Sequence, residues 1–213
     1  MEKILFIGNS HTYYNDMPDI VTNLYILAGK EKPLVTMLCD GGKTYIWHSD
    51  KPQTRFNIKY GRYDKVVMQD RAHPFIGTEQ FFEGIELMKA LIDPTGAKIC
   101  LSETWPSLAH DYPRQEEILP AHHAAAKKYG LALAPCGDAW AVVRATHPEI
   151  EIYFTDGEHP SGYGSYLNAC LIYRAINEGE QLRFVESEIY NKRGLDVDKC
   201  RILMDIANAT PLE

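Results

Sequence analysis

The sequence predicts an α/β fold, a three-layer α/β/α sandwich built on a five-stranded parallel sheet, in a single domain over residues 1–213. Short apolar runs alternate along the chain with longer segments in which apolar residues recur every three or four positions. This alternation is typical of β-α-β units. A chain of 213 residues with 45% apolar residues can also bury a core on both faces of such a sheet.

Five short apolar runs predict the strands. They lie at residues 3–7, 34–38, 65–68, 98–101 and 131–133. Because crossover connections make all five strands parallel, their carboxyl ends should all lie at the same end of the sheet. Ligands of such sheets bind at that end, so we expect the functional residues there.

Amphipathic patterns predict the helices. Between the first two strands, apolar residues recur at helical spacing from Met17 to Ala28, with Asp16 as a candidate N-cap and Gly29 as the end. Further helices are expected at residues 81–92, 115–129, 138–146, 162–177 and 197–207. Residues 181–193 are polar and give no clear pattern.

Charge and composition exclude several classes of protein. The net charge of −7 argues against a nucleic-acid partner, which would need clustered cations. The apolar run at residues 3–7 is too short for a signal segment, and no run approaches the roughly 18 apolar residues of a membrane span. We therefore expect a soluble, cytoplasmic protein that does not bind membranes. The five cysteines are odd in number and widely spaced, which predicts buried thiols without a disulfide framework and leaves Cys39 as a candidate neighbour of the site.

Three residues of complementary chemistry lie at the two ends of the chain. Ser10 directly follows the first predicted strand, and Gly8 before it permits a tight turn that would expose the hydroxyl. Asp156 and His159 lie three residues apart in a segment that leads into a predicted helix. Serine needs a base to become a nucleophile, and a carboxylate orients the histidine that supplies it. The pattern predicts a Ser-His-Asp triad.

These short motifs resemble blocks of the SGNH (GDSL-like) hydrolase superfamily. Gly8-Asn9-Ser10 is similar to its first block, usually Gly-Asp-Ser, and Asp156-x-x-His159 matches its last block. The segment from His159 to Leu167, which reads HPSGYGSYL, resembles a subgroup known mostly as predicted esterases. The resemblance implies a flavodoxin-like fold, with Ser10 as the nucleophile, His159 as the general base and then acid, and Asp156 as the group that orients His159.

The same resemblance implies an oxyanion hole. Its expected donors are the N–H of Ser10, the N–H of Gly41 or Gly42 with Gly42 preferred, and a side-chain amide from the third block. That block is normally Gly-x-Asn-Asp, whereas this chain has Val-Met-Gln-Asp at residues 67–70. Gln69 carries the same amide as asparagine on a stem one methylene longer, so we expect it to complete the hole. The alternative is that Gln69 only binds loop backbone.

Other residues near the predicted strand ends are candidates for contact with the substrate or for packing. The candidate substrate contacts are Asn9, His11, Gly41 and Trp105, with plain packing as the alternative for His11. Asp70 and Arg71 are expected to pair at the surface. Three further histidines are expected to be surface residues without carboxylates at ligand spacing, so no metal site is predicted: His110, His122 and His123.

The residues together predict a serine esterase that hydrolyses small acyl esters, such as O-acetyl groups on carbohydrates. The implied partner is a small-molecule or carbohydrate ester, and the chemistry requires no cofactor and no metal. Two alternatives stay open from the sequence. The chain could be a non-catalytic module that binds carbohydrate or another small ligand, since the third block departs from the family pattern. It could also be an O-acyltransferase, because the same triad can pass an acyl group to a sugar rather than to water.

Overall fold

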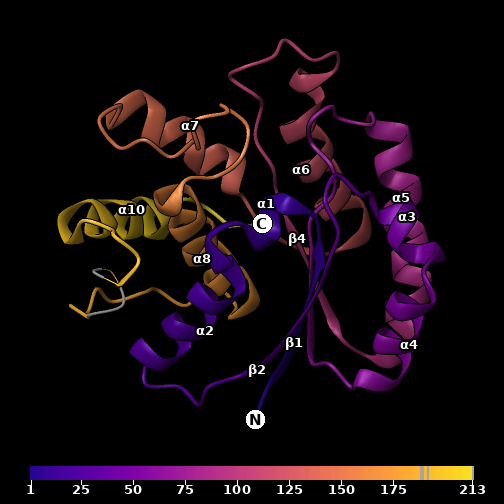
Figure 1. Cartoon of the computed structure of the whole chain (residues 1–213). Helices are drawn as coiled ribbons and strands as arrows, with labels where there is room; N and C mark the ends of the chain where they lie inside the picture. Colours follow the sequence, from indigo (N-terminus) through magenta and orange to yellow (C-terminus); the bar gives the residue numbers. More distant parts are fainter. Residues whose placement is uncertain (188–189, 191, 213) are drawn as a thin grey trace.

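The computed structural model describes residues 1–187, 190 and 192–212. Its centre is a sheet of five parallel strands in the order β2-β1-β3-β4-β5 (Figure 1). The strands are β1 (Lys3–Gly8), β2 (Leu34–Cys39), β3 (Lys65–Met68), β4 (Lys98–Ser102) and β5 (Ala132–Ala134). All five predicted strands are confirmed to within one or two residues, and their order is that of the flavodoxin-like doubly wound sheet.

Helices cover both faces of the sheet, as predicted for the three-layer sandwich (Figure 1). One layer consists of α2 (Met17–Leu27), α7 (Cys136–Thr146), α8 (Gly162–Ile176) and α10 (Val197–Ala209). The other consists of α3 (Tyr45–Asp50), α4 (Pro52–Gly61), α5 (Thr78–Ile92) and α6 (Ile118–Tyr129). A short helix, α1 (Ser10–Tyr13), follows β1 directly.

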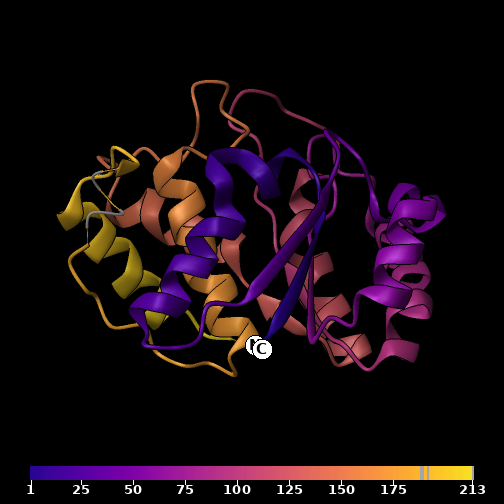
Figure 2. The same cartoon turned by 60° about the horizontal axis from the view of Figure 1, so that its bottom comes forward.

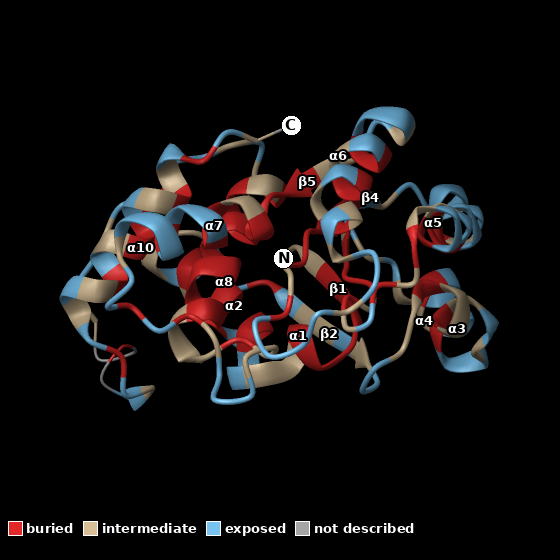
Figure 3. Ribbon diagram, turned by 90° about the horizontal axis from the view of Figure 1, so that it is seen from above, coloured by how far each residue is buried: buried red, intermediate tan, exposed pale blue. Residues whose placement is uncertain are grey.

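The alternation of side chains along β1 divides the core in two. Ile4 and Phe6 pack into the cluster beneath α2 and α8, while Leu5 and Ile7 pack into the cluster beneath α5 and α6. Helix α8 is the most deeply buried helix and lies alongside α2 (Figures 2 and 3). This packing fixes the start of α8 relative to the end of β1, which is where the candidate site forms.

Helices α3 and α4 were not predicted from the sequence. In α4 only Thr54 and Ile58 are buried, so the segment has no continuous apolar stripe. Its start is set instead by Pro52, which suits the first turn of a helix. Residues 181–187 form no helix or strand, and residues 188, 189 and 191 of the segment without a clear pattern lie outside the described residues.

The cysteines of the described part of the chain are mostly buried, as the sequence predicted. Cys100, Cys136, Cys170 and Cys200 are buried free thiols, whereas Cys39 at the end of β2 is half-buried. No described helix combines the length and the apolar content that crossing a bilayer would require.

The first turn of α8 gives a matched test of this packing. A methyl group added at Gly164 would collide with the carbonyl oxygen of Ile152 and with Trp140, whereas one at Gly162 would meet only the flexible end of Leu195. We expect Gly164→Ala to lower the free energy of unfolding by about 1–3 kcal/mol through overpacking. Gly162→Ala should change it by about 0.5 kcal/mol or less. Thermal unfolding of both variants measures the difference, and equal melting temperatures would contradict the close approach of α8 to residue 152.

Candidate active site

The candidate nucleophile stands where β1 passes into α1. Asn9 caps this helix, because its Oδ1 accepts the backbone N–H of His11 at 3.1 Å, and Ser10 is the first helical residue. Gly8 is required before the turn, since a Cβ at this position would collide with the side chains of Thr12 and Gln69. The short helix thus presents Ser10 at the carboxyl edge of the sheet, as the sequence predicted.

The structure brings the other two predicted triad residues to Ser10. His159 Nε2 lies 2.8 Å from Ser10 Oγ, and His159 Nδ1 lies 2.7 Å from Asp156 Oδ2. Because the carboxylate accepts at Nδ1, this nitrogen carries the proton of a neutral imidazole and leaves Nε2 as the acceptor for the serine hydroxyl. The three side chains form one continuous hydrogen-bonded line.

The loop before α8 holds Asp156 in place through its own backbone. Asp156 Oδ1 accepts the N–H groups of Glu158 and His159, each at 2.9 Å. Partial burial raises the pKa of the Asp156 carboxyl, but these two hydrogen bonds and the contact with the His159 ring outweigh it and hold the pKa below its usual value. Asp156 is therefore ionised and ready to orient the histidine.

A turn after β2 lies beside the nucleophile. It contains Gly41 and Gly42, both exposed, and Gly42 has a φ of +67°, in the left-handed region that favours glycine. The turn is tied to the Ser10 segment because Asp40 N–H donates to the Gly8 carbonyl at 3.1 Å and Asn9 Nδ2 donates to the Lys43 carbonyl at 3.1 Å. The predicted oxyanion turn and the predicted nucleophile thus form one hydrogen-bonded unit.

Gln69 lies under this unit and is 4% exposed. Its Oε1 accepts Asn9 N–H at 3.2 Å and Thr12 Oγ–H at 3.0 Å, and its Nε2 donates to the carbonyl of Asp70. One amide N–H is therefore bound to backbone, as the alternative interpretation of this residue expected. In this conformation Gln69 supports the turn that carries Ser10.

Asp70 corrects one sequence expectation, since it does not pair with Arg71 at the surface. Its side chain is 1% exposed, and its Oδ1 accepts the backbone N–H groups of Tyr45 at 2.9 Å and Arg71 at 2.8 Å. Burial raises the pKa of Asp70 to about 7, against the pull of these two hydrogen bonds. The carboxyl joins the start of α3 to the end of β3.

The rings of Tyr14 and His11 flank the imidazole of His159, with Trp105 behind His11, and none was assigned this role from the sequence. The Tyr14 ring lies parallel to this imidazole, with centroids 4.2 Å apart, and the His11 ring lies parallel at 5.1 Å. Trp105 packs edge-on against His11, stacks on Trp140, and donates from Nε1 to the Glu158 carbonyl at 3.0 Å. These contacts brace the histidine and its loop.

This burial revises the candidate substrate contacts. Asn9, His11 and Trp105 are 1%, 6% and 2% exposed, so their side chains lie beneath the surface and are placed to support the site. Burial also lowers the pKa of His11 well below its usual value, which keeps this ring neutral. Of the four candidates only Gly41 stays exposed at the rim.

The histidines of α6 also depart from the expectation of surface residues. His122 is 0% exposed, donates from Nδ1 to the Ile118 carbonyl at 2.7 Å, and has its pKa lowered to about 4 by burial. His123 Nε2 lies 2.9 Å from Asp138 Oδ2 and 3.4 Å from Glu103 Oε1, so two carboxylates distant in sequence do reach it. Among the described residues, His123, Glu103 and Asp138 form a group that could hold a metal ion. Glu103 also accepts the backbone N–H of Asp138 at the start of α7.

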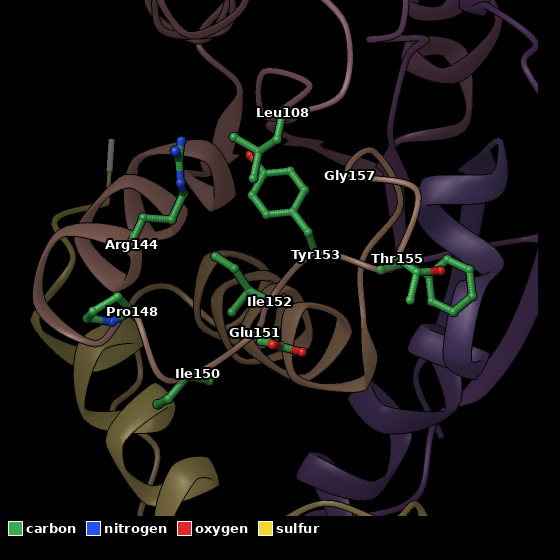
Figure 4. A pocket seen from close by; sticks show the side chains of 10 residues that line it. Leu108, Arg144, Pro148, Ile150, Glu151, Ile152, Tyr153, Thr155 and Gly157 are labelled. Carbon is green, nitrogen blue, oxygen red and sulfur yellow. The ribbon is translucent and has the colours of Figure 1, made fainter.

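A cavity of about 610 Å³ borders the loop that carries Asp156, with Thr155 and Gly157 in its lining (Figure 4). Leu108, Arg144, Tyr153 and Gly157 are among its lining residues, whereas Ser10 and His159 are not. The cavity is bounded by residues of the loop after β4, whose Leu108 N–H donates to the Gly157 carbonyl at 2.8 Å. This contact braces the Asp156 loop.

Comparison with known proteins identifies the architecture. No family model matches the chain, and no curated protein sequence does. Among solved structures, a lipase/acylhydrolase from Enterococcus faecalis matches with a TM-score of 0.69 and 22% identity, over 88% of this chain and 100% of that chain. A DUF4886 family protein from Bacteroides uniformis matches with a TM-score of 0.72 and 15% identity, over 97% of this chain and 93% of that chain. The chain has their fold.

The same fold occurs in an acetylxylan esterase from Geobacillus stearothermophilus, which was solved as a catalytic mutant. It matches with a TM-score of 0.63 and 16% identity, over 87% of this chain and 97% of that chain. The predicted three-layer sandwich is therefore confirmed both by the sheet itself and by these structural neighbours.

The burial of the Asp70 carboxyl predicts how the stability of the protein changes with pH. Its folded-state pKa of about 7 lies above the unfolded value of 3.8, so the folded state binds the extra proton between these values. Its contribution to stability is present below about pH 4 and is lost as the pH rises through about 7. In Asp70→Asn this loss is absent. Urea unfolding at about pH 5 and about pH 8 should therefore show the variant gaining stability relative to the wild type at the higher pH, and parallel behaviour of the two proteins would refute the buried titration.

Proposed function

We propose that this chain is a serine esterase that hydrolyses small acyl esters through Ser10, His159 and Asp156. The observation that carries the proposal is the hydrogen-bonded line of 2.8 Å and 2.7 Å between these side chains. Ser10 and His159 are 149 positions apart in sequence, so the alignment requires the whole fold. A Ser-His-Asp arrangement with this geometry is recognised by its roles, whichever fold carries it.

The geometry supports the usual two-step acyl transfer. His159 Nε2 takes the proton of Ser10 as Oγ attacks the ester carbonyl. The N–H of Ser10, which lies in the first turn of α1 and has no partner within that helix, then stabilises the oxyanion together with the N–H of Gly42 in the turn after β2. His159 gives the proton to the leaving alcohol, which departs and leaves an acyl-serine. Water attacks this ester while His159 accepts its proton, and return of that proton to Ser10 Oγ releases the acid.

Gln69 acts in this scheme mainly by holding the Ser10 turn, since its oxygen binds Asn9 N–H and Thr12. The second N–H of its amide remains a candidate third donor to the oxyanion. The natural substrate class we propose is an O-acetyl ester on a carbohydrate. The fold shared with an acetylxylan esterase supports this choice, and the exposed glycine turn gives the alcohol part open access.

The triad geometry also bears on the alternatives. A non-catalytic binding module would have no need for a histidine aligned between a serine and a carboxylate, so the alignment favours catalysis. An O-acyltransferase would use the same acyl-serine and differ only in the acceptor. Product analysis with and without an added sugar alcohol separates acyl transfer from hydrolysis.

Substitution of the triad tests the proposal directly. We expect wild-type protein to hydrolyse p-nitrophenyl acetate, and Ser10→Ala and His159→Ala to lower kcat/KM by about 10³-fold or more, because each removes a group that takes part in acyl transfer. His110→Ala is a matched histidine control, because its side chain is exposed, and should retain activity. Turnover that persists unchanged in Ser10→Ala would rule out this nucleophile.

The Asp156→Asn variant tests whether Asp156 orients His159 without disturbing the fold of the loop. The amide oxygen of asparagine can still accept the N–H groups of Glu158 and His159, so the loop should keep its shape. The amide nitrogen cannot accept from His159 Nδ1, which removes the preference for the reactive tautomer. We expect a loss in kcat on the order of 10³ to 10⁴ with an unchanged melting temperature. Activity near that of the wild type would show that Asp156 does not orient the histidine.

A further inference from the structure

The segment just after α1 contains two consecutive residues in an unfavourable backbone conformation. Asn15 has φ 56° and ψ 25°, and Asp16 has φ 52° and ψ 44°, both in the left-handed region. For residues other than glycine this conformation costs roughly 1–2 kcal/mol each, although Asn and Asp tolerate it best. Such strain persists only where surrounding contacts enforce it.

Asn15 makes the contacts that enforce it. Its Nδ2 donates to the carbonyl of Pro160 at 3.0 Å and to Ser165 Oγ at 2.8 Å. Pro160 directly follows His159, and Ser165 is a fully buried residue of the first turn of α8. Ser165 Oγ in turn donates to the Tyr14 carbonyl at 3.2 Å. The Asn15 amide therefore joins the segment that carries the nucleophile to the segment that carries the base.

This connection sets the position of Tyr14. Its ring lies parallel to the His159 imidazole, with an interplanar angle of 13° and centroids 4.2 Å apart. A ring held in this way limits rotation of the imidazole, and its π face favours the imidazolium that forms when His159 takes the serine proton.

We propose that Asn15 is a positioning residue of this active site: through its hydrogen bonds to Pro160 and Ser165 it holds the Tyr14 ring against His159 and so keeps Nε2 aligned with Ser10 Oγ. The inference rests on the proposed esterase function for its kinetic part. Its structural part concerns the contact between two rings and can be tested without any substrate.

The matched pair Asn15→Gly and Asp16→Gly isolates the Asn15 amide. Glycine adopts the left-handed conformation without strain, so both variants relieve the same backbone cost and both should fold. Of the two residues, Asn15 has the side chain that binds the histidine loop, whereas Asp16 makes no side-chain cap on α2. Asn15→Gly should lower kcat on p-nitrophenyl acetate by about 10- to 100-fold with little change in KM, because alignment matters to the chemical step. Asp16→Gly should leave both parameters unchanged.

The imidazole NMR signals of His159 give the second readout. They are assigned by their loss in His159→Gln and carry a ring-current shift from Tyr14. We expect this shift to be lost in Asn15→Gly and in Tyr14→Leu, and retained in Tyr14→Phe and Asp16→Gly. An unchanged signal in Asn15→Gly would overturn the inference, as would a moved signal with unaltered kcat. If wild-type protein has no turnover, the proposed function fails while the NMR comparison still decides whether Asn15 positions His159.

Discussion

The hydrogen bond between His159 Nε2 and Ser10 Oγ is the interaction on which the rest of this site depends, because it joins two segments that lie 149 residues apart. Ser10 is placed by the end of β1 and the Asn9 cap, and His159 is placed by the loop that enters α8. Neither placement alone would bring His159 Nε2 within hydrogen-bond distance of Ser10 Oγ. The packing of α2 against α8 brings both segments to the same edge of the sheet, so the alignment of the triad is a property of the whole sandwich.

Buried polar residues around the triad explain how a surface loop holds its shape. Trp105 donates to the Glu158 carbonyl, and Leu108 N–H donates to the Gly157 carbonyl, so the segment after β4 braces the Asp156 loop. On the opposite side, Gln69 satisfies the backbone of Asn9 beneath the nucleophile. Trp105 and Gln69 are buried and hydrogen-bonded, and removing the partner of either would leave a desolvated polar atom at a cost of about 1–3 kcal/mol. The site is therefore rigid before any ester arrives, which favours catalysis by fixed hydrogen-bond donors.

The sequence was sufficient for the sheet and for the spacing of Asp156 and His159, because both depend on local patterns. Apolar runs mark parallel strands buried on two faces, and Asp156 and His159 share one short loop whose backbone fixes their spacing. Side-chain environments set by distant segments could not be predicted in this way. Asp70 is buried because α3 packs over it, and the orientation of the Gln69 amide is decided by Asn9 and Thr12. Helices α3 and α4 were missed because they bury few residues and have no continuous apolar stripe.

The proposed esterase depends above all on Ser10 as a nucleophile activated by His159. Intact-mass spectrometry after incubation with a fluorophosphonate, followed by peptide mapping, tests it most directly because the reagent traps the activated serine covalently. We expect one adduct per chain on the peptide that contains Ser10, and a strongly slowed reaction in His159→Ala. Absence of any adduct, or an adduct on another residue that forms equally fast without His159, would contradict it.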